Sequence, residues 1–175
     1  MNDPYARLPE VPVFELRSPD FAEGARLPLS ARSGIFGAGG EDRSPALEWS
    51  GAPEGTRSFV LTVYDPDAPT GSGFWHWSVR DIPGEATSLP ADAGNPDAGL
   101  LPAGAVHGVN EAGLTRFLGA APPQGHGEHR YFFTMSALSV PTLEVDAGAT
   151  PALIGFTLLD SILGRAHLMG TAITE

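Results

Sequence analysis

Cysteine is absent from the 175 residues of the chain. Disulfide bonds, thiolate nucleophiles and cysteine-ligated metals are therefore excluded. Basic residues are few as well: ten Lys and Arg oppose 21 Asp and Glu, which gives a formal net charge of -11. Because proteins hold nucleic-acid phosphates and anionic membrane surfaces mainly through Lys and Arg, neither is expected as a partner. A small anion can still bind locally, where backbone dipoles and histidines outweigh a distant net charge.

Long apolar segments are also missing. No run approaches the roughly 20 apolar residues that a membrane-spanning helix needs. Residues 1–5 show no cationic region leading into an apolar stretch, as a signal peptide would. We therefore expect a cytoplasmic protein with no stable membrane insertion.

Glycine and proline are plentiful, with 22 and 17 copies. They interrupt the whole chain, which is typical of short strands joined by tight turns. Residues 57–64 form the strongest strand pattern, because they are rich in β-branched and aromatic side chains and apolar on both faces. Further strands are predicted at residues 46–49, 74–82, 131–138 and 167–173, with an edge strand within residues 9–16.

One helix is predicted, over residues 153–165. Phe156, Leu159 and Leu163 recur at three- and four-residue steps, which marks one buried face. Thr150, directly before Pro151, is a suitable N-cap with proline in the first turn.

The order of these elements indicates the fold class. Several short strands followed by a late helix predict a mainly β protein, an antiparallel β-sandwich of two sheets with one C-terminal helix and short helical decoration. No internal repeat or linker divides the chain. Residues 1–175 are therefore expected to form a single domain, with residues 1–11 as an N-terminal arm.

Two carboxylates follow the strongest strand directly. Asp65 and Asp67 lie two residues apart, and Pro66 and Pro69 restrict the backbone around them. On an extended segment, residues at this spacing point to the same side, so the pair could serve one site. Asp and Pro are also common wherever a strand ends, so a plain turn is the competing interpretation.

Histidines accompany two other predicted strands. His76 lies among aromatic residues, where packing in the wall of the core is the more common role of a histidine. His126 and His129 follow the Pro122-Pro123 pair in a glycine-rich turn, whose backbone N–H groups could face an anion. A hairpin loop with an incidental polar tip is the alternative.

Together these fragments resemble the signature of a known family. Asp-Pro-Asp-x-Pro after an apolar strand, a later histidine, and Gly-x-His-Arg-Tyr after a Pro-Pro turn are similar to the motifs of the phosphatidylethanolamine-binding, or Raf-kinase-inhibitor-like, family. Residues 44–51 and 165–170 agree with the same pattern, so the resemblance extends over about residues 12–174. The short form of the chain resembles the bacterial branch.

The resemblance implies an antiparallel β-sandwich with a shallow pocket for phosphate-like anions and phosphoryl head groups. It implies a binding protein rather than an enzyme, with no cofactor, that regulates a kinase or protease target by inhibition and forms a homodimer. On the matching positions, Asp65, Asp67, His76 and His129 would line the pocket, and Tyr131, Pro69 and the Pro122-Pro123 turn would form its walls. Ala121 stands where the family usually has glycine, so its methyl group would narrow the approach.

The charges of this expected pocket must balance. An anion beside two aspartates is repelled unless protons or cations intervene. Histidines can supply protons, because they titrate near neutral pH and an adjacent carboxylate favours their charged form. We expect Asp65 or Asp67 to orient a histidine that donates to a phosphoryl oxygen. The other carboxylate would then meet the ammonium of an ethanolamine or choline head group.

Two enzyme classes compete with the binding interpretation. Two Asp and two His form a workable ligand set for Zn²⁺ or Mn²⁺, and the spacing of His126 and His129 adds to it, so a metal-dependent hydrolase is the alternative. No His-Glu-x-x-His motif accompanies these residues. A serine hydrolase lacks the Gly-x-Ser-x-Gly turn that exposes the nucleophile. The glycine-rich residues 34–40 lack the Lys-Ser/Thr of a phosphate-binding loop.

Overall fold

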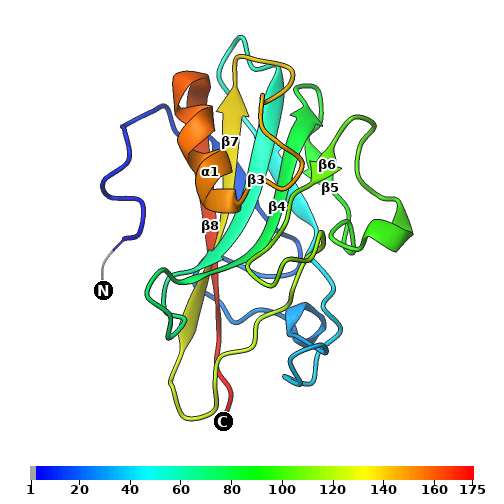
Figure 1. The fold of residues 1–175 in the computed structure, drawn as a ribbon, viewed down its shortest axis with the longest axis vertical. Helices are drawn as coiled ribbons and strands as arrows, with labels where there is room; N and C mark the ends of the chain where they lie inside the picture. The colour runs from blue at the N-terminus through cyan, green and yellow to red at the C-terminus, as the bar shows by residue number, and fades with distance from the viewer. Residues whose placement is uncertain (1–2) are drawn as a thin grey trace.

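Two antiparallel sheets form the framework of the computed structural model, which describes residues 3–175 (Figure 1). One sheet has five strands in the order β6-β4-β3-β7-β8, and the other has three in the order β1-β2-β5. The strands are β1 (Glu15–Arg17), β2 (Leu47–Ser50), β3 (Ser58–Asp65), β4 (Phe74–Pro83), β5 (Ser88–Leu89), β6 (Val106–His107), β7 (His129–Leu138) and β8 (Ile162–Ala172). The helical elements are η1 (Leu29–Ala31), η2 (Pro96–Ala98), α1 (Pro151–Thr157) and η3 (Leu158–Asp160). The predicted fold class is confirmed.

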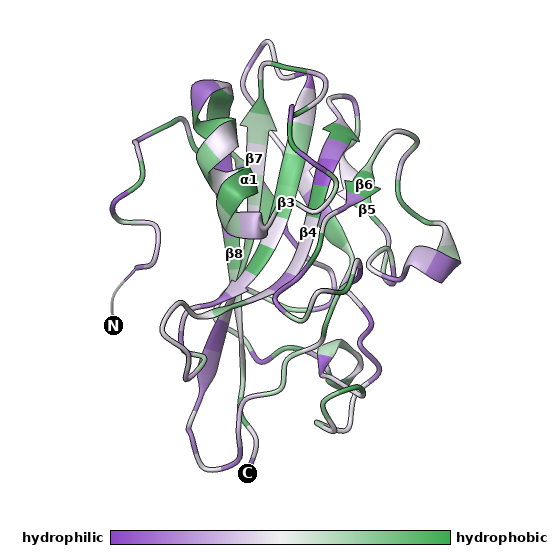
Figure 2. Ribbon diagram, viewed as in Figure 1, coloured by the Kyte–Doolittle hydropathy of each residue, from purple (hydrophilic) through white to green (hydrophobic). Residues whose placement is uncertain are grey.

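Strand β3 lies at the centre of the larger sheet and is covered on both faces. Seven of its eight residues are buried, in agreement with its continuous apolar sequence. It pairs with β4 on one side and β7 on the other, with Val63 opposite Trp77 and Phe133. Figure 2 shows hydrophobic residues along both β3 and β7.

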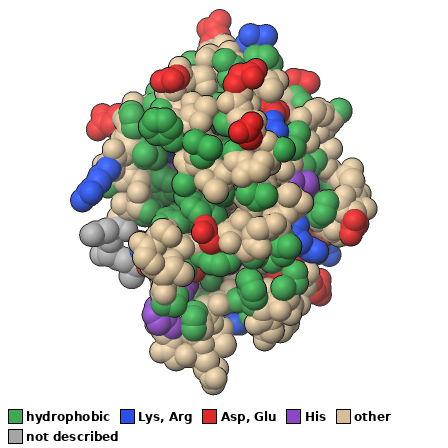
Figure 3. Space-filling model, viewed as in Figure 1, with side chains coloured by type: hydrophobic (Ala, Val, Ile, Leu, Met, Phe, Trp, Pro, Cys, Tyr) green, Lys and Arg blue, Asp and Glu red, His purple; other side chains and the backbone are tan. Residues whose placement is uncertain are grey.

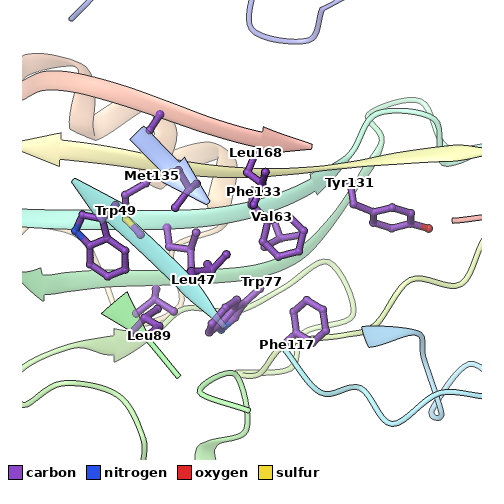
Figure 4. Packing of buried hydrophobic residues seen from close by; sticks show 14 of the residues in the cluster. Leu47, Trp49, Val63, Trp77, Leu89, Phe117, Tyr131, Phe133, Met135 and Leu168 are labelled. Atoms are coloured by element: carbon purple, nitrogen blue, oxygen red, sulfur yellow. The ribbon is translucent and has the colours of Figure 1, made fainter. Parts of the chain in front are cut away.

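The main core fills the space between the two sheets. Figure 4 shows Leu47 and Trp49 of β2 and Leu89 of β5 in the same cluster as Val63, Trp77 and Phe133 of the larger sheet. The Trp49 ring packs edge-on against Phe59 at 5.5 Å between centroids, and Trp77 packs similarly against Phe117 at 5.7 Å. Such edge-to-face aromatic pairs add to the stabilisation from apolar burial.

The outer face of the five-stranded sheet has a second, smaller cluster beneath α1. Its buried members are Val60, Leu138, Leu143, Ala149, Ile154 and Leu158. Helix α1 begins as predicted, because the Thr150 hydroxyl accepts a hydrogen bond from the Leu153 backbone N–H at 3.2 Å and Pro151 occupies the first turn. Within residues 3–175, no helix is both long enough and apolar enough to cross a bilayer.

The predicted end of the helix is wrong. The helix does not continue to residue 165: α1 ends at Thr157, η3 adds one turn, and β8 already begins at Ile162 rather than at residue 167. Strand β8 pairs with β7 along its whole length, from Leu138 opposite Ile162 to His129 opposite Ala172. This long hydrogen-bonded ladder outweighs the helical spacing of the apolar residues, which is only a weak local preference.

The other predicted strands are shifted at their ends. Strand β7 begins at His129, two residues before the prediction, and the edge strand is reduced to β1 with an isolated bridge between Val13 and Arg165. Of the expected N-terminal arm, residues 1–2 lie outside the described residues. Within the rest, the Tyr5 ring lies 4.5 Å from His167 and 5.8 Å from Phe132, on the outer face of β7 and β8.

Two glycines allow the loops at one end of the sandwich to touch. A β-carbon on Gly40 would lie 2.2 Å from the Arg32 backbone oxygen, and one on Gly119 would lie 2.3 Å from the Arg32 backbone carbon. The neighbouring Ala120 forms an isolated parallel bridge with Arg32. The glycine-rich loop at residues 34–40 is thereby held against residues 117–121.

We predict that Gly119→Ala lowers the free energy of unfolding by about 1–3 kcal/mol, because the new methyl group has to displace backbone. Gly148→Ala is the matched control, since a β-carbon there meets nothing within 4 Å and the residue has no positive φ. Its free energy of unfolding should stay within about 0.5 kcal/mol of the original. Urea denaturation of both variants measures the difference, and equal stability would contradict the close packing at Gly119.

Candidate anion-binding site

A cavity of about 150 Å³ opens where the C-terminal end of β3 meets the starts of β4 and β7. The residues that line it are Phe36, Asp65, Ala68, Pro69, Thr70, Phe74, His76, Ala121, Pro123, His129 and Tyr131. Seven of the nine residues expected at the site are therefore brought together. Asp67 does not line the cavity, and of the Pro122-Pro123 turn only Pro123 does.

Asp65 is the buried anchor of the cavity. Its Oδ1 atom accepts hydrogen bonds from the backbone N–H groups of Asp67 at 2.8 Å and Ala68 at 3.0 Å. Its Oδ2 atom lies 2.8 Å from Nδ1 of His129. The two residues are 3% and 1% exposed, so they form a buried pair in which hydrogen bonds occupy both carboxylate oxygens.

A second histidine extends this pair. Nδ1 of His126 lies 2.7 Å from Nε2 of His129. Because Nδ1–H of His129 donates to the Asp65 carboxylate, Nε2 of a neutral His129 is an acceptor, and His126 must donate to it from Nδ1–H. The carboxylate therefore sets the tautomer of both rings.

Asp67 does not line the cavity and binds Arg130 instead. Its carboxylate accepts two hydrogen bonds from the guanidinium, at 2.8 Å and 2.7 Å, and a third from the Arg130 backbone N–H at 3.0 Å. The Arg130 side chain holds the pKa of Asp67 below its ordinary value. The expectation that Asp65 and Asp67 share one side is wrong, because the turn that Asp65 caps begins immediately and ends the strand alternation.

His76 reaches the cavity through an irregularity in β4. Tyr64 lies opposite Trp75 and Val63 opposite Trp77, so His76 is an extra residue of the kind that β-bulges use to redirect a side chain. Its Nδ1 atom lies 2.9 Å from the Leu118 backbone oxygen, which leaves Nε2 for other partners. Burial lowers the pKa of His76, so the ring is neutral until the pH falls below the ordinary histidine range.

Tyr131 lines the cavity and has a buried hydroxyl. The residue is 1% exposed, and its Oη atom makes no hydrogen bond of normal geometry within the part of the chain that is described. Figure 4 shows the hydroxyl pointing away from the other labelled side chains of the core. Burial and the nearby charge of Asp65 raise the pKa of Tyr131, while the Ala121 backbone and the Arg32 charge lower it. The hydroxyl is therefore protonated at neutral pH and can donate a hydrogen bond.

Asp42 does not line the cavity but binds the loops beside it, and it was not identified from the sequence. Its carboxylate accepts hydrogen bonds from the Ser33 hydroxyl and from the backbone N–H groups of Gly34, Ile35 and Gly119, at 2.7 to 2.8 Å. Burial alone would raise the pKa of Asp42, but these hydrogen bonds together hold it below its ordinary value. The sequence signal that could have identified Asp42 is its position just after a glycine-rich turn. The backbone N–H groups of such a turn need an acceptor, and a carboxylate can provide one.

The residues expected for the alternative metal site are not arranged to bind a metal ion. Over residues 3–175, no group of three or more His, Asp or Glu side chains is placed to hold a metal ion. His126 and His129 contact each other directly instead of converging on a shared point, with 4.9 Å between ring centroids.

We predict that Asp65→Asn switches the tautomer of His129. The new amide must keep its oxygen toward the backbone N–H groups of the turn, so its NH₂ group faces His129 and turns Nδ1 into an acceptor. Nitrogen-15 NMR of histidine-labelled protein, above the ordinary histidine pKa of about 6.5, should show the proton on Nδ1 before the change and on Nε2 after it. Asp67→Asn is the control and should leave the tautomer of His129 unchanged. The same tautomer in Asp65→Asn would show that the carboxylate does not set it.

Comparison with known proteins identifies the family of this chain. The family model described as phosphatidylethanolamine-binding protein matches residues 17–173. The UPF0098 protein YbcL of Escherichia coli (strain K12) is 47% identical over 155 residues, which cover 89% of this chain and 85% of YbcL. UPF0098 protein YbhB of the same organism is 43% identical over 157 residues, 89% of this chain and 97% of YbhB. The crystal structure of YbcL superposes with a TM-score of 0.88 at 44% identity, over 93% of this chain and 99% of that one. The chain belongs to the phosphatidylethanolamine-binding protein family.

Proposed function

We propose that the cavity binds a small oxyanion, either free phosphate or the phosphoryl group of a head group, and does not turn it over. The observation that carries this proposal is the buried hydroxyl of the cavity-lining residue Tyr131, which makes no hydrogen bond of normal geometry within the described residues. A buried donor without an acceptor is costly, and an anionic oxygen at that position would satisfy it.

The surrounding charges favour one anion despite the carboxylate. The Asp65 carboxylate accepts a hydrogen bond from the His129 ring at 2.8 Å, and the Arg32 guanidinium lies close enough to lower the pKa of Tyr131. His76 adds a positive charge when an anion draws a proton onto its ring. Arg32, Tyr131 and His76 together therefore outweigh a carboxylate that is already paired.

The size of the cavity fits a phosphoryl group rather than a whole lipid. A volume of about 150 Å³ equals roughly five water molecules at about 30 Å³ each. It also lies below the roughly 300–1,000 Å³ of typical small-molecule sites. Ala121 lines the same space, so its methyl group is already included in this volume.

The cavity lacks a free carboxylate for an ammonium group. Asp67 is bound to Arg130, and both oxygens of Asp65 already accept hydrogen bonds. We therefore expect phosphate and phosphoethanolamine to bind alike, in place of the expected preference for a zwitterion. Inhibition of a kinase or protease and assembly as a homodimer stay predictions of the family resemblance.

We predict that Tyr131→Phe weakens the binding of sulfate by about tenfold or more, because a hydrogen bond to a charged group contributes about 1.5–3 kcal/mol. Sulfate is chosen because its charge is constant near neutral pH. Isothermal calorimetry measures the change, and Tyr64→Phe is the control, since the Tyr64 hydroxyl donates to the Ser72 backbone oxygen outside this cavity. Equal binding by Tyr131→Phe and the original protein would reject the site.

We also predict that sulfate affinity rises as the pH falls from about 7 to about 5. Burial lowers the pKa of His76, so its cationic form is filled only below the ordinary histidine pKa of about 6.5, and a bound anion favours that form. In His76→Gln the rise should be lost, while the affinity at the upper end of the range changes little. A pH dependence that persists in His76→Gln would show that another group takes up the proton.

A further inference from the structure

A second cavity, of about 520 Å³, lies on the opposite face of the five-stranded sheet. Its floor is the outer face of β3, β7 and β8, and its walls are α1, η3 and residues 4–8 of the N-terminal segment. On the face shown in Figure 3, hydrophobic side chains gather around a hollow beside the N-terminal segment. The two cavities share no residue, because neighbouring positions of β3 such as Tyr64 and Asp65 face opposite ways.

The floor of this cavity contains a buried cation that has no carboxylate partner within residues 3–175. Arg165 is 8% exposed and lines the cavity. Its Nη1 atom donates to the Pro9 backbone oxygen at 3.4 Å, whereas its Nη2 atom is buried and makes no hydrogen bond among the described residues. Among the described residues, no Asp or Glu lines the cavity. Because arginine does not give up its proton in proteins, an anion beside the guanidinium would offset its charge.

Other polar groups lie next to the guanidinium. Ser136 is opposite Arg165 in the β7–β8 ladder and lines the same cavity. The Tyr5 hydroxyl is buried, has no hydrogen bond of normal geometry within residues 3–175, and is protonated because burial raises the pKa of Tyr5 to about 12. Arginine and two hydroxyls together can bind the two oxygens of a carboxylate.

The walls away from Arg165 are apolar. Leu8, Pro151 and Leu159 line them, and Phe156 is 74% exposed although it belongs to the lining. The volume falls within the roughly 300–1,000 Å³ of small-molecule sites. One cationic end and a long apolar remainder match a molecule with a single charged head and one hydrocarbon chain.

We propose that this cavity binds a single-chain, long-chain carboxylate, with its head group on Arg165 and its hydrocarbon chain along α1. A peptide fits less well, because its backbone N–H and C=O groups would need partners that these walls do not offer. The binding is independent of the anion pocket and does not rest on the function proposed for it.

Calorimetry with octanoate, decanoate and dodecanoate, each below its micelle concentration, tests this proposal. Affinity should rise by about fourfold for each methylene that becomes buried. Dodecanol should bind at least about tenfold more weakly than dodecanoate, because it cannot pair with a buried guanidinium. Saturating phosphate should not displace dodecanoate; full displacement would assign the binding to the smaller cavity and overturn the proposal.

Three variants locate the site. Arg165→Met should remove the preference for dodecanoate over dodecanol, and Arg57→Met, which deletes an exposed arginine elsewhere, should keep it. Gly155→Leu tests the part of the cavity along α1 and leaves Arg165 unchanged. A β-carbon on this cavity-lining residue meets nothing within 4 Å, so the leucine should fill the space and abolish binding. The unfolding temperature should not fall, because leucine favours a helix more than glycine does. Unaltered dodecanoate binding by Arg165→Met and Gly155→Leu would overturn the proposal. So would a dimer in sedimentation that Gly155→Leu turns into monomers, because a second copy would then be the occupant.

Discussion

The buried hydrogen bond between Asp65 and His129 is the interaction on which the smaller cavity depends. It joins the end of β3 to the start of β7, and the other oxygen of the same carboxylate closes the turn after β3. A carboxylate that is 3% exposed is stable only if its charge is met by donors, and here three N–H groups meet it. The pairing fixes the orientation of His129 and brings Tyr131, two residues later on β7, to the same cavity. The arrangement of the residues around this cavity therefore follows from the hydrogen bonds that the Asp65 carboxylate requires.

The five-stranded sheet separates two chemically different spaces. On its inner face, polar groups converge at the end of the sandwich, around a cavity of about 150 Å³. On its outer face, α1 covers only part of the surface, and the remaining space contains one buried arginine among apolar walls. Alternation along β3 assigns Asp65 to the first space and Tyr64 to the second. One strand can thus contribute to two sites without either sharing a side chain with the other.

Local chemistry explains what the sequence could and could not predict. Residues 57–64 were identified because a central strand must be apolar on both faces, and the structure places β3 within one residue of that range. Asp67 was misplaced because strand alternation was applied to a segment that turns as soon as Asp65 caps it. The helix was predicted too long because its apolar spacing also suits β8, whose pairing with β7 is a non-local interaction. Asp42 was missed for a similar reason: one of its four hydrogen bonds comes from Gly119, which is far away in the sequence.

The position of β3 at the centre of the sheet also determines when the protein can fold. Its two neighbours are made at very different times, because β4 follows it closely while β7 begins only at His129. During synthesis, β3 therefore has one unpaired edge and an uncovered apolar face until β7 and β8 leave the ribosome. The long segment between β3 and β7 must close before the contacts between these strands can form, and this step is slow. A nascent chain with an exposed β3–β4 hairpin is therefore the state most prone to aggregation and to chaperone binding. The proline-rich turn after β3, which Asp65 caps, restricts the backbone conformations of that hairpin until β7 is synthesised.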